Sequence, residues 1–157
     1  MTSAARLIDS DSSKGARCIA VLGAGPRGAG LLERIVANYD ADATGQLVVH
    51  LIDPPPPGAG RIWRDAQSGL LKLNSLAADV TMFTDETSTI EGPVREGPSL
   101  VEWAQLATRG ALPGYDLDAE VPQLATEIRA LGPASFPTRR LQSRYLGWFF
   151  EQAADAA

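Results

Sequence analysis

The sequence predicts an α/β fold in which a parallel sheet is flanked by helices. Residues 17–23 (RCIAVLG) and 47–53 (LVVHLID) are short apolar runs of the kind that form buried parallel strands. Between them, the segment from Pro26 to Tyr39 carries apolar residues at the spacing of a helix. Strand, helix and strand together form a βαβ unit, whose crossover we expect to be right-handed in a three-layer core.

A glycine-rich turn joins the first predicted strand to the first helix. Gly23, Gly25 and Gly28 match the pattern G-x-G-x-x-G. The first glycine permits a tight turn, the second lets a pyrophosphate approach the backbone, and the third lets the helix pack close to the strand. Pro26 lies in the first helical turn, where its missing N–H costs nothing, and the remaining free N–H groups suit a diphosphate. This pattern is typical of a Rossmann-type dinucleotide-binding fold.

Asp53 ends the second apolar run, where this fold places an acid for the ribose. It follows Gly28 by 25 residues, somewhat more than the usual spacing. Its carboxylate would accept hydrogen bonds from ribose hydroxyls and repel a 2′-phosphate, which favours FAD or NAD over NADP. Arg27 either adds charge near the pyrophosphate or faces solvent. The competing interpretation is a simple glycine turn with Asp53 capping a loop, and the complete order of elements favours dinucleotide binding.

The remaining segments predict loops and further helices. The segment 53–63 (DPPPPGAGRIW) is expected to form a stiff extended loop, and the state of residues 70–84 is left open. Ser99 and Glu102 have the spacing of a capping box at the start of a helix. We expect a second helix near residues 119–131.

A last helix is predicted from about Thr138, because apolar residues recur at helical spacing after it.

Composition narrows the classes of function. The 157 residues suit one domain, and the net charge of -5 with no basic run argues against a nucleic-acid or acidic-membrane partner. Cys18 is the only cysteine and is expected to be buried, while His50 is the only histidine, so no metal site is predicted. No apolar stretch is long enough for a membrane span. Residues 1–16 lack a signal-peptide core and are expected to be a disordered tail, which favours a cytoplasmic location.

Five motifs together resemble a known family. GAGPRG, IDPPPPGAGRIW, LLKLNSLAADVTMF, EGPSLVEW and FPTRRLQSRYLGWF occur in the order and rough spacing of the bacterial FAD-NAD(P)-binding family. That family is related to the flavin-dependent N-hydroxylating monooxygenases. The resemblance covers roughly residues 17–150, and its later motifs are more specific than the first, which many flavoproteins share. It implies FAD as the cofactor, with NAD(P)H as the reductant in a complete enzyme.

The resemblance also implies cofactor-binding positions. These are Gly23, Ala24, Gly25, Pro26, Arg27 and Gly28 along the pyrophosphate, Asp53 with Pro54 at the adenosine ribose, Gly60, Arg61 and Trp63 beside the ribityl chain and flavin, and Asn74 and Ser75 near the flavin. Other interpretations stay open, because Trp63 also suits a core and Asn74 a turn cap. On the last predicted helix, we expect Arg140 to lie on the solvated surface and Tyr145 to pack in the core.

The functional prediction is the FAD-binding portion of an NAD(P)H-dependent flavin oxidoreductase, of the monooxygenase type. Residues 17–157 form the predicted domain, which resembles the N-terminal part of a longer flavoprotein and is expected to be incomplete at its C-terminus. No second G-x-G-x-x-G follows a strand, and no catalytic acid, base or nucleophile stands out, so enzymatic activity of this chain is left open. The alternatives are a non-catalytic FAD or NAD binding module that needs a partner subunit, or a truncated inactive relative.

The partners expected are the dinucleotide and a small-molecule substrate that the sequence does not identify. An incomplete sheet exposes an edge and apolar surface, so we also expect a homodimer or a partner subunit.

Overall fold

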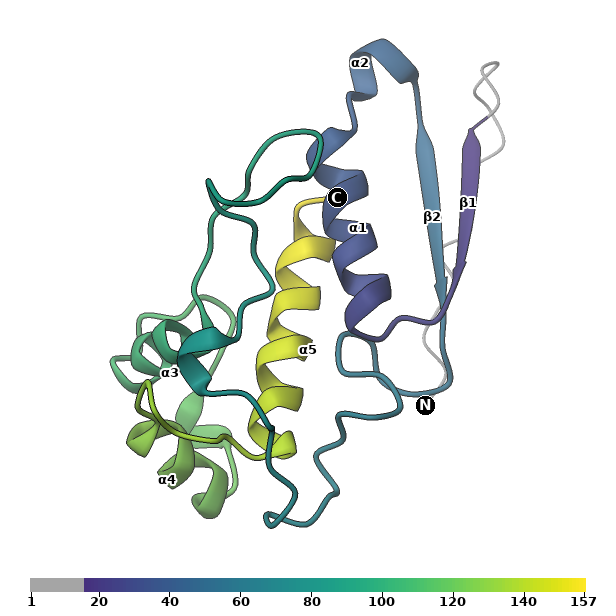
Figure 1. The fold of residues 1–157 in the computed structure, drawn as a ribbon. Coiled ribbons are helices and arrows are strands. Elements are labelled where there is room, and N and C mark those ends of the chain that lie inside the picture. The colour runs from purple at the N-terminus through teal and green to yellow at the C-terminus, as the bar shows by residue number, and fades with distance from the viewer. Residues whose placement is uncertain (1–15) are drawn as a thin grey trace.

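The computed structural model describes residues 16–157, and so most of the predicted tail lies outside the described residues. Figure 1 shows the two strands on one side, α1 and α5 next to them in the view, and α3 and α4 further away; α1 packs against α5. The elements in chain order are β1 (Arg17–Leu22), α1 (Pro26–Asn38), α2 (Ala41–Thr44), β2 (Leu47–Ile52), η1 (Ala77–Asp79), α3 (Leu100–Thr108), η2 (Leu117–Ala119), α4 (Pro122–Ala130) and α5 (Arg139–Asp155).

The strands β1 and β2 form a two-stranded parallel sheet, and α1 lies between them in sequence. Their register runs from Arg17 opposite Leu47 to Leu22 opposite Ile52. The predicted strand–helix–strand unit is therefore confirmed. Both strands end at the glycine-rich loop, where the N–H of Gly23 donates a hydrogen bond to the carbonyl of Ile52 at 2.8 Å.

Helix boundaries follow the capping signals in the sequence. Ser99 and Glu102 form the predicted capping box at the start of α3, and Pro122 occupies the first turn of α4. The side chain of Thr138 accepts a hydrogen bond from the N–H of Leu141 and so begins α5. Each cap satisfies donors that the first turn of a helix leaves unpaired.

The segment 70–84, whose state the sequence left open, is an irregular chain that contains η1 and runs beside the start of α5. Its backbone is tied there by hydrogen bonds from Leu73 N–H to Pro137 O at 2.8 Å and from Arg139 N–H to Leu71 O at 2.9 Å.

The core lies among the helices. Trp103 on α3 and Tyr145 on α5 are fully buried, and their rings meet edge to face at 5.9 Å. The hydroxyl of Tyr145 donates to Pro98 O and accepts from Met82 N–H, so this buried polar group is satisfied. The prediction that Tyr145 is a core residue is confirmed.

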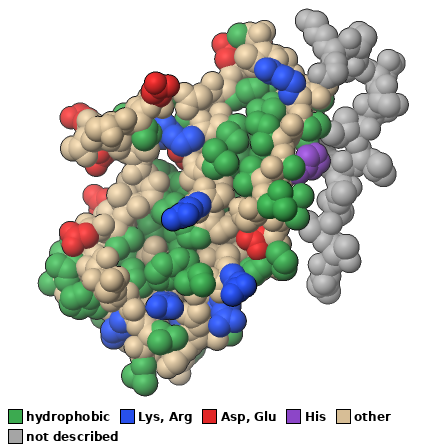
Figure 2. All heavy atoms as spheres, turned by 45° about the vertical axis from the view of Figure 1, so that its right-hand side comes forward, with side chains coloured by type: hydrophobic (Ala, Val, Ile, Leu, Met, Phe, Trp, Pro, Cys, Tyr) green, Lys and Arg blue, Asp and Glu red, His purple; other side chains and the backbone are tan. Residues whose placement is uncertain are grey.

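The prediction of buried strands and of a three-layer core is wrong for the described residues. α1 and α5 lie on one side of the sheet, where the half-buried Val49 and Leu51 line a hollow of about 310 Å³ together with residues of both helices. On the other face Leu22 is 83% exposed and Ile52 is 55% exposed. Cys18, predicted to be buried, lies on this open face and is exposed, as are its neighbours Arg17 and Ile19, because no described segment covers this part of β1 on either face. In Figure 2 hydrophobic side chains gather next to the histidine.

Candidate functional site

The glycine-rich loop between β1 and α1 has two positions that only glycine fits. Gly23 has a φ of +106°, in the region that L side chains rarely adopt. A Cβ at Gly28 would lie 2.1 Å from the carbonyl oxygen of Gly23, which is closer than any real contact. The loop therefore turns tightly and draws α1 against the end of β1, as the motif predicts.

The N-terminus of α1 has no side-chain cap. Gly25 is the N-cap residue, carries no side chain, and is followed by Pro26, which has no N–H. The N–H groups of Arg27 and Gly28 therefore have no capping acceptor, and the positive end of the helix dipole lies at the same place. The side chain of Arg27 is exposed beside them. Open donors with a positive potential are what a diphosphate needs.

Asp53 holds the glycine-rich loop from the end of β2. Its Oδ2 atom accepts a hydrogen bond from the N–H of Ala24 at 2.8 Å. Among the described residues its Oδ1 atom accepts no hydrogen bond, so this oxygen is free for a ligand hydroxyl. The carboxylate thus braces the loop and still has an acceptor to offer, which fits the predicted ribose role. Pro54, next to it, is exposed.

The proline-rich segment returns over the glycine-rich loop. The N–H of Gly58 donates to Ala24 O at 2.7 Å, and a Cβ at Gly60 would lie 2.8 Å from the Cα of Gly25. Both glycines have positive φ, +84° at Gly58 and +63° at Gly60. The two loops are therefore in direct backbone contact, and neither glycine tolerates a side chain.

Together the two loops line an open hollow of about 500 Å³, which we call the cradle. This volume lies in the range of small-ligand sites. Its walls are Leu22, Gly23, Gly25, Pro26, Arg27, Gly28, Ala59, Arg61, Ile62 and Trp63. The structure thus brings together most of the predicted site residues. Asp53 and Gly60 contact the glycine-rich loop without lining the cradle, and Ala24, Pro54, Asn74 and Ser75 do not line it either.

Trp63 closes one side of the cradle and is contacted by α5. The guanidinium carbon of Arg139 lies 5.7 Å from the centre of the Trp63 ring, within the range of a cation–π contact. Sequence reasoning missed Arg139 and named its neighbour Arg140 instead. Arg140 is half-buried against Gly69 rather than freely solvated, because loop 60–70 folds over the start of α5.

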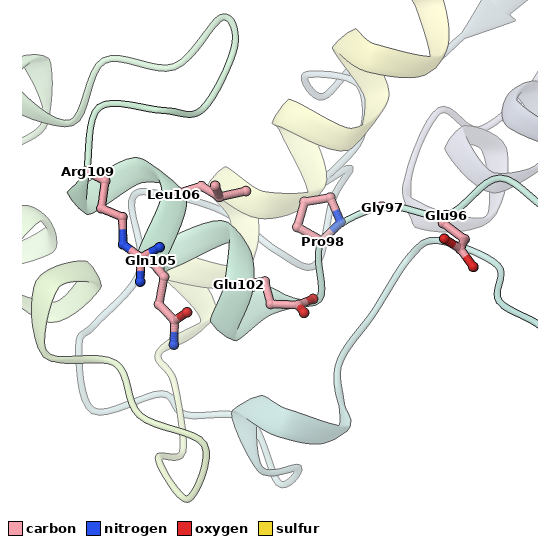
Figure 3. A pocket seen from close by; sticks show the side chains of 7 residues that line it. All are labelled: Glu96, Gly97, Pro98, Glu102, Gln105, Leu106 and Arg109. Carbon is pink, nitrogen blue, oxygen red and sulfur yellow. The ribbon is translucent and has the colours of Figure 1, made fainter.

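A second hollow lies on the outer side of α3 and is not part of this site. Figure 3 shows the side chains that line it, from Glu96 to Arg109. Its volume is about 490 Å³. Of its two carboxylates, Glu102 is already committed to the cap of α3, where hydrogen bonds from the backbone and side chain of Ser99 lower the pKa of Glu102. The hollow shares no residue with the cradle.

Two negative observations concern residues 16–157. Within them, no three His, Cys, Asp or Glu side chains are grouped as a metal site would require. In the same part of the chain, every helix is too short or too polar to cross a membrane.

Comparison with known proteins assigns the chain to a family. It matches the FAD-NAD(P)-binding family over residues 20–157, which is most of its length. The chain belongs to this family. The match includes the glycine-rich loop, the proline-rich loop and α5, which together form the cradle and its support.

The chain is also similar to three curated enzymes. It is 40% identical over 140 residues to an L-aspartate N-monooxygenase (nitrosuccinate-forming) of Streptomyces davaonensis, covering 88% of this chain and 21% of that protein. It is 43% identical over 136 residues to a nitrosuccinic acid synthase of Aspergillus oryzae, covering 85% and 18%. A Streptomyces cremeus L-aspartate N-monooxygenase is 43% identical over 145 residues, covering 88% and 21%. The chain therefore spans about a fifth of the length of these relatives.

Proposed function

We propose that this chain binds FAD in the cradle, with the pyrophosphate against the N-terminus of α1. The observation that supports this most is the uncapped helix start, which lies at a hollow that the second glycine loop also lines. In a family described as FAD-NAD(P)-binding, such a site suits a dinucleotide. Gly23, Gly25 and Gly28 leave room for the phosphates.

The other residues take roles along the rest of the cofactor. The free Oδ1 of Asp53 would accept hydrogen bonds from the adenosine ribose, and Arg61 and Trp63 would flank the ribityl chain and flavin. Asn74 and Ser75 stay proposed as flavin neighbours. Asn74 is exposed and Ser75 is half-buried, so both are accessible to a ligand.

In a complete enzyme, we propose that the cofactor serves the oxygenation of the amino group of a small amino acid, with NAD(P)H as reductant. The relatives support this, since two are named L-aspartate N-monooxygenases and one a nitrosuccinic acid synthase. Bound flavin would supply the redox chemistry. The part of this chain is to hold and orient the cofactor, because its described residues supply binding groups around the cradle.

The test is an FAD titration of the purified apo protein and of the variant Gly25→Asp. A Cβ at Gly25 would meet only the Cα of Gly60 at an ordinary 3.7 Å, and Asp is a favourable N-cap residue, so the variant is expected to fold. Its carboxylate would occupy the diphosphate position and repel it, which should weaken FAD binding by at least about 100-fold.

The matched control is Gly30→Asp, which adds the same charge to the same helix. A Cβ at Gly30 meets nothing within 4 Å, and the residue does not line the cradle. FAD affinity should change by less than about twofold, because this carboxylate would project into open space outside the cradle and not into the diphosphate position. Equal FAD affinity of Gly25→Asp and wild type would contradict the proposed site.

A second candidate is a binding module that works only with a partner polypeptide. The open face of the sheet favours it, since parallel sheets are normally covered on both faces. NAD(P)H oxidation that appears only when the FAD-loaded chain is mixed with a co-purifying partner would support it. Turnover by the chain alone would exclude it.

A further inference from the structure

Behind Trp63, on the side away from the glycine-rich loop, lies a second and larger cavity of about 690 Å³. Ala59 and Trp63 line both this cavity and the cradle. The wall between the two is therefore the thin segment 59–63. A wall with a void behind it can move away from the cofactor unless something spans the void and holds it.

One side chain spans this void. Arg144, on α5, places its Nη1 atom 2.6 Å from Oδ2 of Asp65, which is two residues beyond Trp63. Its Nε atom lies 2.8 Å from Oε1 of Glu120, in an ion pair without hydrogen-bond alignment. The guanidinium thus joins the wall segment to the residue that follows η2.

The other end of this connection is fixed in the core. The side chain of Glu120 is only 9% exposed and accepts a hydrogen bond from the hydroxyl of Tyr115 at 3.0 Å. The Tyr115 ring meets Trp103 edge to face at 4.9 Å. Burial and the adjacent carboxylate raise the pKa of Tyr115, so its hydroxyl stays a proton donor to Glu120. The Glu120 end is therefore rigid, whereas Asp65 is 48% exposed on the loop.

From this arrangement we propose that Arg144 is a positioning residue of the cradle. It holds Trp63 in place by binding Asp65 across the cavity, from an anchor made by Glu120 and Tyr115. The Arg139 contact with the Trp63 ring comes from the same helix and acts in the same direction. The inference rests on the proposed FAD site, because it assigns a role in that site to residues that do not touch the cofactor.

The experiment compares FAD affinity and thermal stability of three variants. Asp65→Asn removes the negative charge at the loop end of the connection and leaves the Arg144–Glu120 pair intact. It should weaken FAD binding about threefold at an unchanged melting temperature, as expected for a half-exposed ion pair. Arg144→Met removes both pairs and should weaken FAD binding about tenfold. Arg144→Lys, which keeps the charge, should recover part of that loss.

The matched control is the ion pair between Arg129 on α4 and Asp118 on η2. Its Nη2 and Oδ1 atoms are 2.9 Å apart, and neither residue lines the cradle or the cavity behind it. Asp118→Asn should leave FAD affinity unchanged within about 1.5-fold. A double-mutant cycle should show that Asp65→Asn has no further effect once Arg144 is Met.

The outcomes separate the two proposals. No FAD binding by the wild-type protein overturns the proposed function. FAD binding by the wild type with equal affinity in Asp65→Asn and Arg144→Met overturns the positioning role and leaves the function standing. A fall in affinity that merely follows melting temperature, and is matched by Asp118→Asn, also overturns the positioning role.

Discussion

The helical part of this molecule and its sheet differ in how their apolar residues are covered. Around α3, α4 and α5, large side chains such as Trp103 and Tyr145 have no exposed surface. In the sheet, Leu22 and Ile52 expose more than half of theirs. The helices thus bury their apolar faces against one another, whereas neither strand holds a buried residue.

The difference shows which region supports the candidate site. The glycine-rich loop is attached to the sheet, but the wall that faces it is attached to α5. Stability therefore comes from the helical side, while the sheet supplies the geometry of the turn. The open face is the surface that a partner polypeptide or a second copy would cover, since parallel sheets are rarely left open.

The largest expected difference between the two regions is in the free energy of unfolding, when one large apolar side chain in each is truncated to alanine. Trp103→Ala should lower the free energy of unfolding by about 3–5 kcal/mol, because it empties the centre of the core. Leu22→Ala should change it by less than about 0.5 kcal/mol, since this side chain is exposed. Urea unfolding of both variants measures the difference. A similar loss in Leu22→Ala, with sedimentation showing a dimer, would mean that the open face is covered in solution.

A smaller difference in stability is expected between alanine substitutions at two glycines of α1. Gly28→Ala should cost about 1–3 kcal/mol, because the new Cβ collides with the carbonyl of Gly23. Gly30→Ala has open space and should stabilise the helix by about 0.5–1 kcal/mol. FAD titration should show lost binding only for Gly28→Ala. Equal stability of the two variants would mean that the loop and helix are not closely packed.

The smallest effect is a pH dependence at the start of α3. Hydrogen bonds from Ser99 lower the pKa of Glu102 in the folded protein, so the ionised carboxylate stabilises the fold at neutral pH. This contribution should disappear as the pH falls from about 5 through the lower folded pKa.

Thermal melts of Glu102→Gln and the wild type should therefore converge toward acid pH. Ser99→Ala should keep part of the effect, because the backbone N–H of Ser99 still donates to the carboxylate. A constant difference between wild type and Glu102→Gln across this range would exclude the assignment.

Local features of this molecule were predictable from the sequence, and long-range ones were not. The glycine turn, the capping box at Ser99 and the Thr138 start of α5 each depend on a few neighbouring residues, and the structure confirms all of them. The exposure of Cys18 depends on which elements cover the sheet. An apolar run does not carry that information.

The candidate site divides in the same way. The glycines and Asp53 could be identified as site residues because they belong to a motif with fixed spacing. The hydrogen bond from the N–H of Ala24 to the Asp53 carboxylate could not be predicted from that motif. The contacts of Arg139 with Trp63 and of Arg144 with Asp65 join segments that are far apart in the chain. The motif FPTRRLQSRYLGWF contains both arginines, but it does not show which distant residues their side chains contact.

The packing of Gly58 has a consequence for the order of events during synthesis. A Cβ at this position would lie 2.3 Å from the carbonyl of Leu146 and 2.9 Å from the Cα of Gly147, so the proline-rich loop rests directly on the backbone of α5. A ribosome makes residues 17–60 long before it makes that helix. A nascent chain that ends before α5 therefore lacks the surface on which the loop closes, and we infer that the cradle becomes competent only after α5 has emerged.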